Sequence, residues 1–235
     1  MKIRLPTCQL LAGAIVLIAF SGSAQLINGN FATGDFTGWT LFNTPNGGTS
    51  VSQVVPFDIT GAGVPVNCAE FEVGETSGGI GGGGLGQGAG IYQDVTLGSG
   101  PLNISLDIAA TSEGNNADGG TFELLLNGAT VASDPLGGIG AGQTIRSTLN
   151  YSGSISAGTY QVAIEMLRGY GTEYPNTPYQ YLSSIELSGS SVPEPSSLAI
   201  CSAAFLVLLL FREAARFRRA TNLNRVKTLK QETAE

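Results

Sequence analysis

Apolar side chains recur at every second position through most of the chain, and this period is the feature that most restricts its fold. Residues 102–110 show it best, because the apolar positions there are Leu102, Ile104, Leu106, Ile108 and Ala110. A β-strand turns successive side chains to opposite faces, so the pattern predicts a strand with one face on a core. Residues 160–166 and 181–187 repeat the pattern.

Further segments complete the prediction of an all-β domain. Residues 122–126 and 129–133 flank Asn127 and Gly128, a pair that favours a tight hairpin. Weaker strands are expected at residues 39–42, 49–55, 69–73, 91–97 and 144–151. Roughly nine short strands, with no long helix between them, indicate an antiparallel β-sandwich over residues 25–191.

The N-terminal residues 1–24 have the composition of a secretory signal peptide. Lys2 and Arg4 precede an apolar stretch at 10–20, and small residues follow at 21–24. We therefore expect export by the Sec machinery, a signal helix, and cleavage after Ala24. A lipoprotein signal is excluded because Cys8 precedes the apolar stretch instead of following it.

The C-terminal region has three parts in a fixed order: a proline-rich motif, an apolar segment at residues 196–211, and a basic cluster. The motif is Val192, Pro193, Glu194 and Pro195, and the cluster is Arg212, Arg216, Arg218 and Arg219. Proline ends regular structure, and the apolar segment would form a transmembrane helix of about 24 Å. The arginines predict that residues 220–235 form a basic cytoplasmic tail, with the domain on the other side of the membrane.

These three parts resemble the PEP-CTERM sorting signal of Gram-negative bacteria, also catalogued as the C-terminal region of some ice-binding proteins. The resemblance implies that an exosortase recognises Pro193, Glu194 and Pro195 and that the protein is anchored in the inner membrane transiently. It would then reach the cell surface or an extracellular polysaccharide matrix. The family usually ends just after the basic cluster, whereas this chain continues to Glu235. An ordinary single-pass anchor is the alternative.

The start of the domain resembles galactose-binding-like jelly-roll domains, which include many carbohydrate-binding modules. Residues 26–31 and 34–39 carry this resemblance, and residues 90–95 and 102–110 continue it more loosely. Relatives often close with an acid-containing strand that helps to hold a structural calcium ion, but residues 181–187 have serine where the acid is expected. A calcium site would therefore depend on oxygens from Asn28, Glu70 and Glu72.

A polar, aromatic loop at residues 170–179 is the candidate glycan-binding site. Its side chains for such a role are Tyr170, Glu173, Tyr174 and Tyr179. The loop could instead be a packed connection at one end of the sandwich. Trp39, the single tryptophan, could stack on a sugar, but its position favours the start of a core strand.

The glycine-rich run at 78–90 contains a GxGxxG pattern, yet a strand pattern follows it instead of a helix. We therefore interpret the run as a flexible loop and not as a nucleotide site. Cys68 is the one cysteine between residues 25 and 191, so no internal disulfide is expected there, and Cys68 is interpreted as a small buried residue.

Composition restricts the function of the domain. Residues 25–191 contain fourteen acidic and two basic side chains, a net charge of −12, which disfavours nucleic acid as a partner. The chain has no histidine, so the usual general base is missing. Glycan cleavage by carboxylates would need a pair drawn from Asp107, Glu123, Glu165 and Glu173, and their spacing does not indicate one.

The sequence thus predicts an exported, non-catalytic surface or matrix protein that binds glycans. Two alternatives remain at this stage. One is a structural or ice-binding surface protein, although Thr121, Thr130, Thr144 and Thr148 do not suggest a regular threonine array. The other is a glycan-cleaving enzyme.

Overall fold

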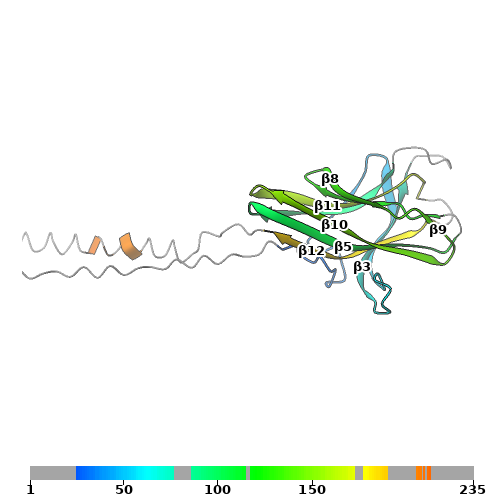
Figure 1. The fold of residues 1–235 in the computed structure, drawn as a ribbon, viewed down its shortest axis with the longest axis horizontal. Helices are drawn as coiled ribbons and strands as arrows, with labels where there is room; N and C mark the ends of the chain where they lie inside the picture. Colours follow the sequence, from blue (N-terminus) through cyan, green and yellow to red (C-terminus); the bar gives the residue numbers. More distant parts are fainter. Residues whose placement is uncertain are drawn as a thin grey trace, which may run out of the picture. The chain divides into compact units, whose positions relative to one another are not determined.

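The computed structural model describes residues 25–76, 86–114, 117–172 and 177–189, together with residues 205–207, 209, 211 and 212 near the C-terminus. The described residues between 25 and 189 form two antiparallel five-stranded sheets (Figure 1). The first sheet has the order β1 (Thr40–Asn43), β4 (Gln87–Leu97), β11 (Gly158–Arg168), β7 (Thr121–Leu126) and β8 (Ala129–Pro135). The second has the order β10 (Gln143–Ile155), β5 (Gly100–Ser112), β12 (Tyr179–Gly189), β3 (Val66–Glu75) and β2 (Gly47–Phe57).

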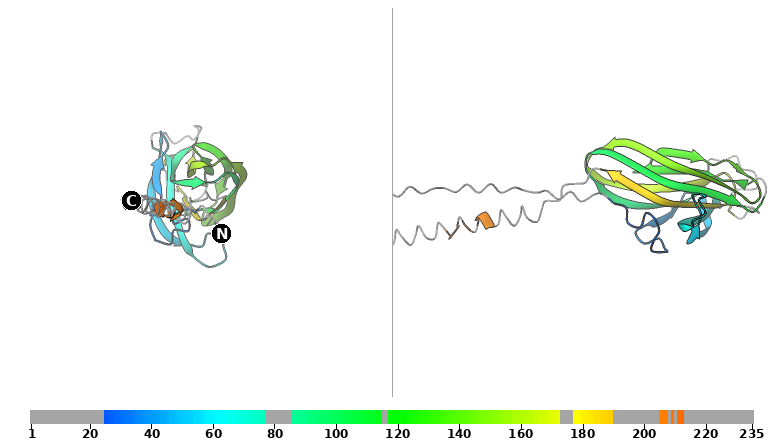
Figure 2. Two further views of the ribbon diagram at one scale, coloured as in Figure 1. Left: turned by 90° about the vertical axis from the view of Figure 1, so that its left-hand side faces the viewer. Right: turned by 60° about the horizontal axis from the view of Figure 1, so that its bottom comes forward.

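The chain passes repeatedly from one sheet to the other. Among the ten described strands of these sheets, β2–β3 and β7–β8 are the sequence neighbours that pair within one sheet. The other connections cross the sandwich, so that β5 lies between β10 and β12, and β11 between β4 and β7. A short two-stranded ribbon pairs β6 (Ala117–Asp118) with β9 (Gly138–Ile139). Figure 2 shows the fold from two further directions.

The predicted antiparallel β-sandwich is confirmed. Every predicted strand segment overlaps an observed strand, and the Asn127-Gly128 turn joins β7 to β8, with both residues at positive φ as a tight hairpin requires. The glycine-rich run was predicted as a loop, but its last residues, from Gln87, belong to β4. Gly90 fits there because a Cβ would lie 2.8 Å from the ring of Phe42.

The core lies between the sheets and takes the apolar positions that alternate along the strands. In β5, Leu102, Ile104, Leu106 and Ile108 are at most 1% exposed. Trp39 is also buried in this core and its Nε1–H donates to the carbonyl of Asn28, so its interpretation as a core residue is confirmed.

A second, smaller cluster lies on the outer face of the β10-containing sheet, where β2 ends and the chain turns back toward β3. It contains Ile59, Cys68, Ala109 and Tyr181, and the ring of Phe57 stacks on Tyr181 at 3.8 Å. Cys68 is fully buried, as predicted, and burial raises the pKa of its thiol to about 11.

The terminal segments are largely outside the described residues. These include the predicted signal peptide at 1–24, the motif Val192, Pro193, Glu194 and Pro195, and the arginines Arg216, Arg218 and Arg219. The described residues between 205 and 212 are helical, and Arg212 is exposed. Within the described part of the chain, no helix has the length and apolar character needed to cross a membrane. The transmembrane helix at 196–211 therefore stays a prediction.

Core packing predicts the effect of truncating Leu106, which is 1% exposed at the centre of β5. Leu106→Ala should lower the free energy of unfolding by about 2–5 kcal/mol, because it removes buried methyl groups and leaves a cavity. Urea denaturation of residues 25–191, followed by circular dichroism, measures this. The exposed control Ser156→Ala, which lies between β10 and β11, should change stability by less than about 0.5 kcal/mol, and equal effects of the two variants would contradict the assigned core.

Candidate functional site: a polar groove across three strands

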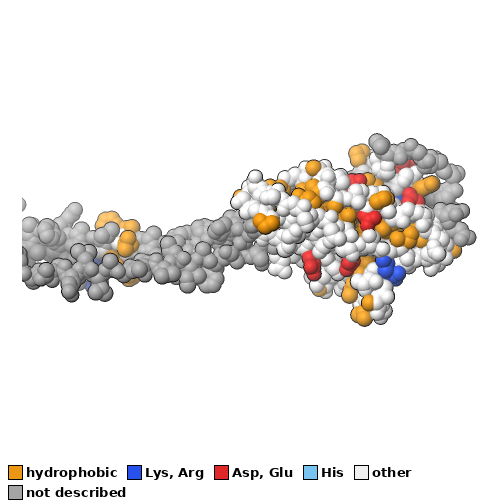
Figure 3. Space-filling view, in the orientation of Figure 1, with side chains coloured by type: hydrophobic (Ala, Val, Ile, Leu, Met, Phe, Trp, Pro, Cys, Tyr) orange, Lys and Arg blue, Asp and Glu red, His pale blue; other side chains and the backbone are white. Residues whose placement is uncertain are grey.

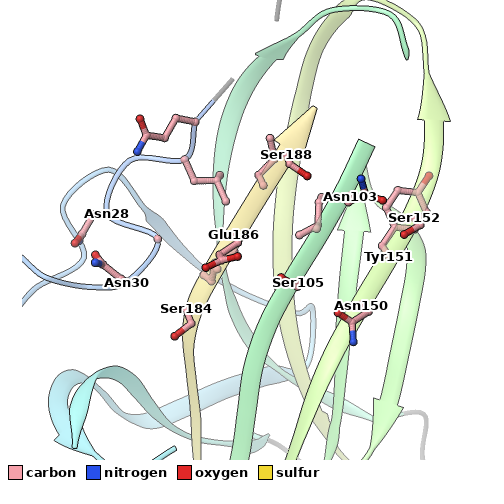
Figure 4. A pocket seen from close by; sticks show the side chains of 16 residues that line it. Asn28, Asn30, Asn103, Ser105, Asn150, Tyr151, Ser152, Ser184, Glu186 and Ser188 are labelled. Atoms are coloured by element: carbon pink, nitrogen blue, oxygen red, sulfur yellow. The ribbon is translucent and has the colours of Figure 1, made fainter. Parts of the chain in front are cut away.

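A groove of about 580 Å³ crosses the outer face of the sheet where β10, β5 and β12 lie side by side. Figure 4 shows the side chains that these strands contribute and the neighbouring loop that carries Asn28 and Asn30. The strand residues that face outward and line the groove are Asn103 and Ser105 of β5, Asn150 and Ser152 of β10, and Glu186 and Ser188 of β12.

Strand register sets these polar side chains in two rows. Asn103 lies opposite Ser152 on one side and Ser188 on the other. Ser105 lies opposite Asn150 and Glu186 in the same way. Neighbouring strands are about 4.8 Å apart, so each row offers three adjacent hydrogen-bonding groups to one ligand.

A register shift in β12 lets the N-terminal segment form one wall of the groove. The pairing of β12 with β5 shifts between Ser183 and Glu186, where Ser184 has a φ of 53°. At this irregularity the N–H of Ile185 donates to the carbonyl of Gly29 at 2.9 Å. A Cβ on Gly29 would lie 2.4 Å from the carbonyl oxygen of Ile185, so this close approach requires glycine.

The opposite sheet holds the same N-terminal segment in place. Gln93 of β4 is buried, and its Oε1 accepts from the N–H of Ile27 at 2.7 Å. Its Nε2 donates to the carbonyls of Ile27 and Gly38 at 3.1 and 2.6 Å. The buried amide of Gln93 thus accepts one hydrogen bond and donates two, which fixes the N-terminal segment to the first sheet. The bond between Gly29 and Ile185 fixes the same segment to the second sheet.

Asn28 is a structural residue of this wall. Its φ of 57° is one that asparagine tolerates, and its Nδ2 donates to the carbonyls of Asp35 and Thr37 at 2.9 and 3.1 Å. Its Oδ1 accepts from the N–H of Thr33. Hydrogen bonding from Thr33, and then from Thr37, lowers the pKa of the exposed Asp35 carboxyl below its ordinary range.

The groove is lined by both polar and apolar residues, and its described lining residues include no lysine, arginine or histidine. Both arginines of residues 25–191 are used elsewhere. Arg146 donates through Nε to the carbonyl of Asp58 and lies over the ring of Phe57, whereas Arg168 is 3% exposed and donates to the carbonyls of Asp118 and Val73. Figure 3 shows acidic side chains scattered over one face of the domain.

The tyrosine loop of the sequence prediction does not contribute to this groove. Tyr170 follows β11, is 41% exposed and lies against Arg168, while Tyr179 begins β12 and packs half-buried against the second cluster. Glu173 and Tyr174 lie outside the described residues. The groove escaped sequence analysis because its residues are serines and asparagines at outward strand positions, a pattern that any solvated strand face shows.

The three candidate calcium ligands are engaged with protein groups. Asn28 holds the N-terminal loop, Oε1 of Glu70 accepts from Nε2 of Gln53 at 2.6 Å, and Oε2 of Glu72 accepts from the hydroxyl of Ser50 at 2.5 Å. No group of three or more acidic, cysteine or histidine side chains arranged for a metal ion occurs among the described residues.

Of the four acids weighed for catalysis, Glu173 lies outside the described residues, and the other three are divided between the two sheets. Asp107 lies on β5, while Glu123 of β7 and Glu165 of β11 are direct cross-strand neighbours on the other sheet. Burial, and then the charge of Glu123, raise the pKa of the Glu165 carboxyl above its ordinary value. Neither glutamate lines the polar groove.

Comparison with known proteins does not name a family for the chain. No family model matches the sequence, and the search of curated proteins finds no match. Among solved structures, the chain is similar to the carbohydrate-binding module TmCBM61 in complex with beta-1,4-galactotriose, with 12% identity and a TM-score of 0.41 over 71% of this chain and 99% of that chain. The xylan-binding domain CBM22-1 of Paenibacillus barcinonensis Xyn10C has 14% identity and a TM-score of 0.38, over 74% of this chain and 99% of that one.

An adhesin domain shows a likeness of the same size. The K1 cleaved adhesin domain of Lys-gingipain from Porphyromonas gingivalis has 16% identity and a TM-score of 0.39, over 69% of this chain and 96% of that chain. Likenesses of this strength carry no argument about ligand or activity. The groove is therefore interpreted from its own residues.

The close approach at Gly29 predicts a specific effect of a small substitution. Gly29→Ala should displace the N-terminal segment from β12, because the added Cβ meets a backbone oxygen that cannot move alone. We expect a lower melting temperature and faster amide exchange in residues 25–38. Gly138→Ala is the matched control, since a Cβ there meets nothing within 4 Å and no positive φ is involved. Equal melting temperatures for both variants would contradict the docking.

The Glu165–Glu123 pair predicts a pH effect on stability. The pKa of Glu165 is raised in the folded state, so the folded protein favours the protonated carboxyl. The stability that this carboxyl contributes is therefore fully present below the ordinary pKa of 4.5 and is lost as pH rises through the folded pKa. Glutamine does not ionise, so Glu165→Gln should have a higher free energy of unfolding than the parent at about pH 7. The difference should shrink at about pH 3, where Glu165 of the parent is also neutral. Denaturant midpoints at both pH values measure it, and a gap independent of pH would exclude the mechanism.

Proposed function

We propose that this protein is an exported, non-catalytic binder of uncharged glycans, and that the groove across β10, β5 and β12 is its binding site. The observation that supports the proposal is the double row of hydroxyl and amide side chains, with the carboxylate of Glu186, on three adjacent strands. Sugars present closely spaced hydroxyl groups that both donate and accept hydrogen bonds. Asparagine and serine side chains match them, because they also do both.

The charge of the site supports an uncharged ligand. Glu186 is the acid among the lining residues, and no positive group lies beside it there. A uronate or sulfate would approach a domain of net charge −12 without a cation to pair with. A neutral polysaccharide avoids this repulsion and can donate a hydroxyl hydrogen bond to the Glu186 carboxylate.

Two further observations favour binding over the alternatives. The threonines considered for ice binding are divided between the sheets, with Thr121 and Thr130 on the first sheet and Thr144 and Thr148 on the second. Catalysis at the groove would need a second carboxylate near Glu186, and the described lining residues do not supply one.

Substituting both asparagines should separate this site from the tyrosine loop. Asn103→Ala with Asn150→Ala removes two side chains that each donate and accept, and should weaken retention of a neutral polysaccharide about ten-fold or more in affinity gel electrophoresis. Tyr170→Ala with Tyr179→Ala is the control and should leave retention unchanged. The opposite result would move the site to the tyrosine loop, and a uronate polymer retained better than a neutral one would contradict the ligand class.

We propose in addition that residues 192–219 are a sorting signal handled by an exosortase, which delivers the domain to the cell surface or matrix. The support is the order of the proline-rich motif, the apolar segment and the arginines in the sequence. Insertion and orientation follow from apolar length and positive charge. Recognition of Pro193, Glu194 and Pro195 follows from the resemblance to PEP-CTERM proteins.

A single substitution separates sorting from simple anchoring. Glu194→Ala leaves the apolar segment and Arg212, Arg216, Arg218 and Arg219 intact, so membrane insertion should persist while processing stops. An uncleaved, membrane-bound form should then accumulate in an exosortase-containing host, as judged by immunoblotting of cell fractions. Normal maturation of this variant would reduce the segment to a plain anchor.

A further inference from the structure

The edges of the two sheets are the places where another strand could add. The edge strands are β1 and β8 in the first sheet and β10 and β2 in the second. An edge strand presents unpaired backbone N–H and C=O groups, and natural proteins protect such edges with short strands, proline, charged side chains such as lysine, or β-bulges. Comparing the four edges therefore shows which one is open to a partner.

Three of the four edges carry a protecting feature. β1 has four residues. β2 contains Pro56, and its pairing with β3 shifts between Thr49 and Ser52. β8 ends at Pro135, and its pairing with β7 shifts opposite Leu124 and Leu125.

β10 is the least protected of the four edges, because its one charged side chain, Arg146, is bonded through Nε to the carbonyl of Asp58. It has thirteen residues without proline or lysine, and it pairs with β5 at every position from Gln143 to Ile155 without a register shift. Its inward side chains Ile145, Tyr151 and Ile155 are partly buried, although they pack against the core. A strand added to this edge would cover them and would pair the free backbone groups.

We propose that β10 pairs with β10 of a second copy of this chain, antiparallel and about a two-fold axis at Leu149. Leu149 is the midpoint of β10, so this register alone lets all thirteen residues pair. Outward residues then meet outward residues, which keeps Ile145 and Tyr151 of both copies on the core side. The strand carries one charge, Arg146, and in this register Arg146 lies opposite Ser152 of the partner subunit, so no like charges meet.

This pairing joins the two sheets into one and places two grooves side by side. Asn150 and Ser152 line the groove from β10 itself, so both grooves border the shared edge. A polymer could then occupy both grooves at once, which raises its apparent affinity without a new contact. The dimer does not depend on the glycan proposal, because it can be measured without any glycan.

The register predicts opposite effects of two substitutions at Ser152, which is exposed. Ser152→Glu places a carboxylate across the strand pair from Arg146 of the partner subunit twice per dimer, and Ser152→Lys places a second cation there. The guanidinium keeps its charge for this interaction, although its Nε donates to the carbonyl of Asp58 in its own subunit. The dimer dissociation constant should fall for the first variant and rise for the second, by about two- to thirty-fold. Thr159→Glu and Thr159→Lys, at an exposed position of the central strand β11, are the matched controls and should have no effect.

Sedimentation equilibrium of the full chain in a density-matched, sugar-free detergent gives these constants at about 0.15 M salt, where a Debye length of about 8 Å screens the repulsion between two domains of net charge −12 each. Because strand pairing alone buries less than a standard interface, the parent should pass from monomer to dimer as its concentration rises. Amide exchange in residues 143–155 of the parent should slow over the same range, which tests the interface without any substitution. A monomer at every concentration, or a dimer that responds equally to both charges at position 152, would overturn the proposal.

Discussion

One-sided burial along β5 is the constraint on which the fold and the candidate site both depend. Leu102, Ile104, Leu106 and Ile108 are at most 1% exposed and hold the sheets together. The alternation that buries them turns Asn103 and Ser105 outward, into the centre of the groove. A shift of one residue in the pairing of β5 would exchange the two sets, so core packing also fixes the groove.

The N-terminal segment forms one wall of the groove that the strands β10, β5 and β12 line. It is held by Gln93 of one sheet and by the backbone of Ile185 in the other, and it lies where the register of β12 changes. Local irregularities such as bulges commonly lie beside functional sites because they redirect side chains. Here the irregularity at Ser184 makes room for Gly29 to approach the strand, and the resulting wall borders a face that would otherwise be a flat sheet.

The glycan-binding proposal and the dimer proposal share one strand. β10 contributes Asn150 and Ser152 to the groove, and its other edge is the long, unprotected one. Hydroxyl and amide side chains suit both roles, since they bind sugars and also tolerate pairing with a second strand. An exported protein with a weak site and a weak self-association could still bind a polymer strongly, because several weak contacts act together.

The sequence determined the elements of the domain. Period-two alternation located the strands, and Asn127 and Gly128 located the hairpin. The position of Trp39 at the start of a predicted strand placed it in the core. Each of these signals depends on local geometry or on burial. The signal peptide and the sorting motif are likewise properties of the linear chain, and they stay predictions. The sequence also led to the loop at 170–179 as the binding site, since exposed tyrosines are the visible signal for polar ligands.

Only the tertiary structure decided which strands are neighbours. Most connections cross between the sheets, so the positions that line the groove come from residues 25–30, 103–105, 150–152 and 184–188, which are far apart in the chain. Serine and asparagine at these positions show nothing unusual in the sequence. They form a site because long-range pairing sets three outward faces in register, and the edge character of β10 follows from the same pairing.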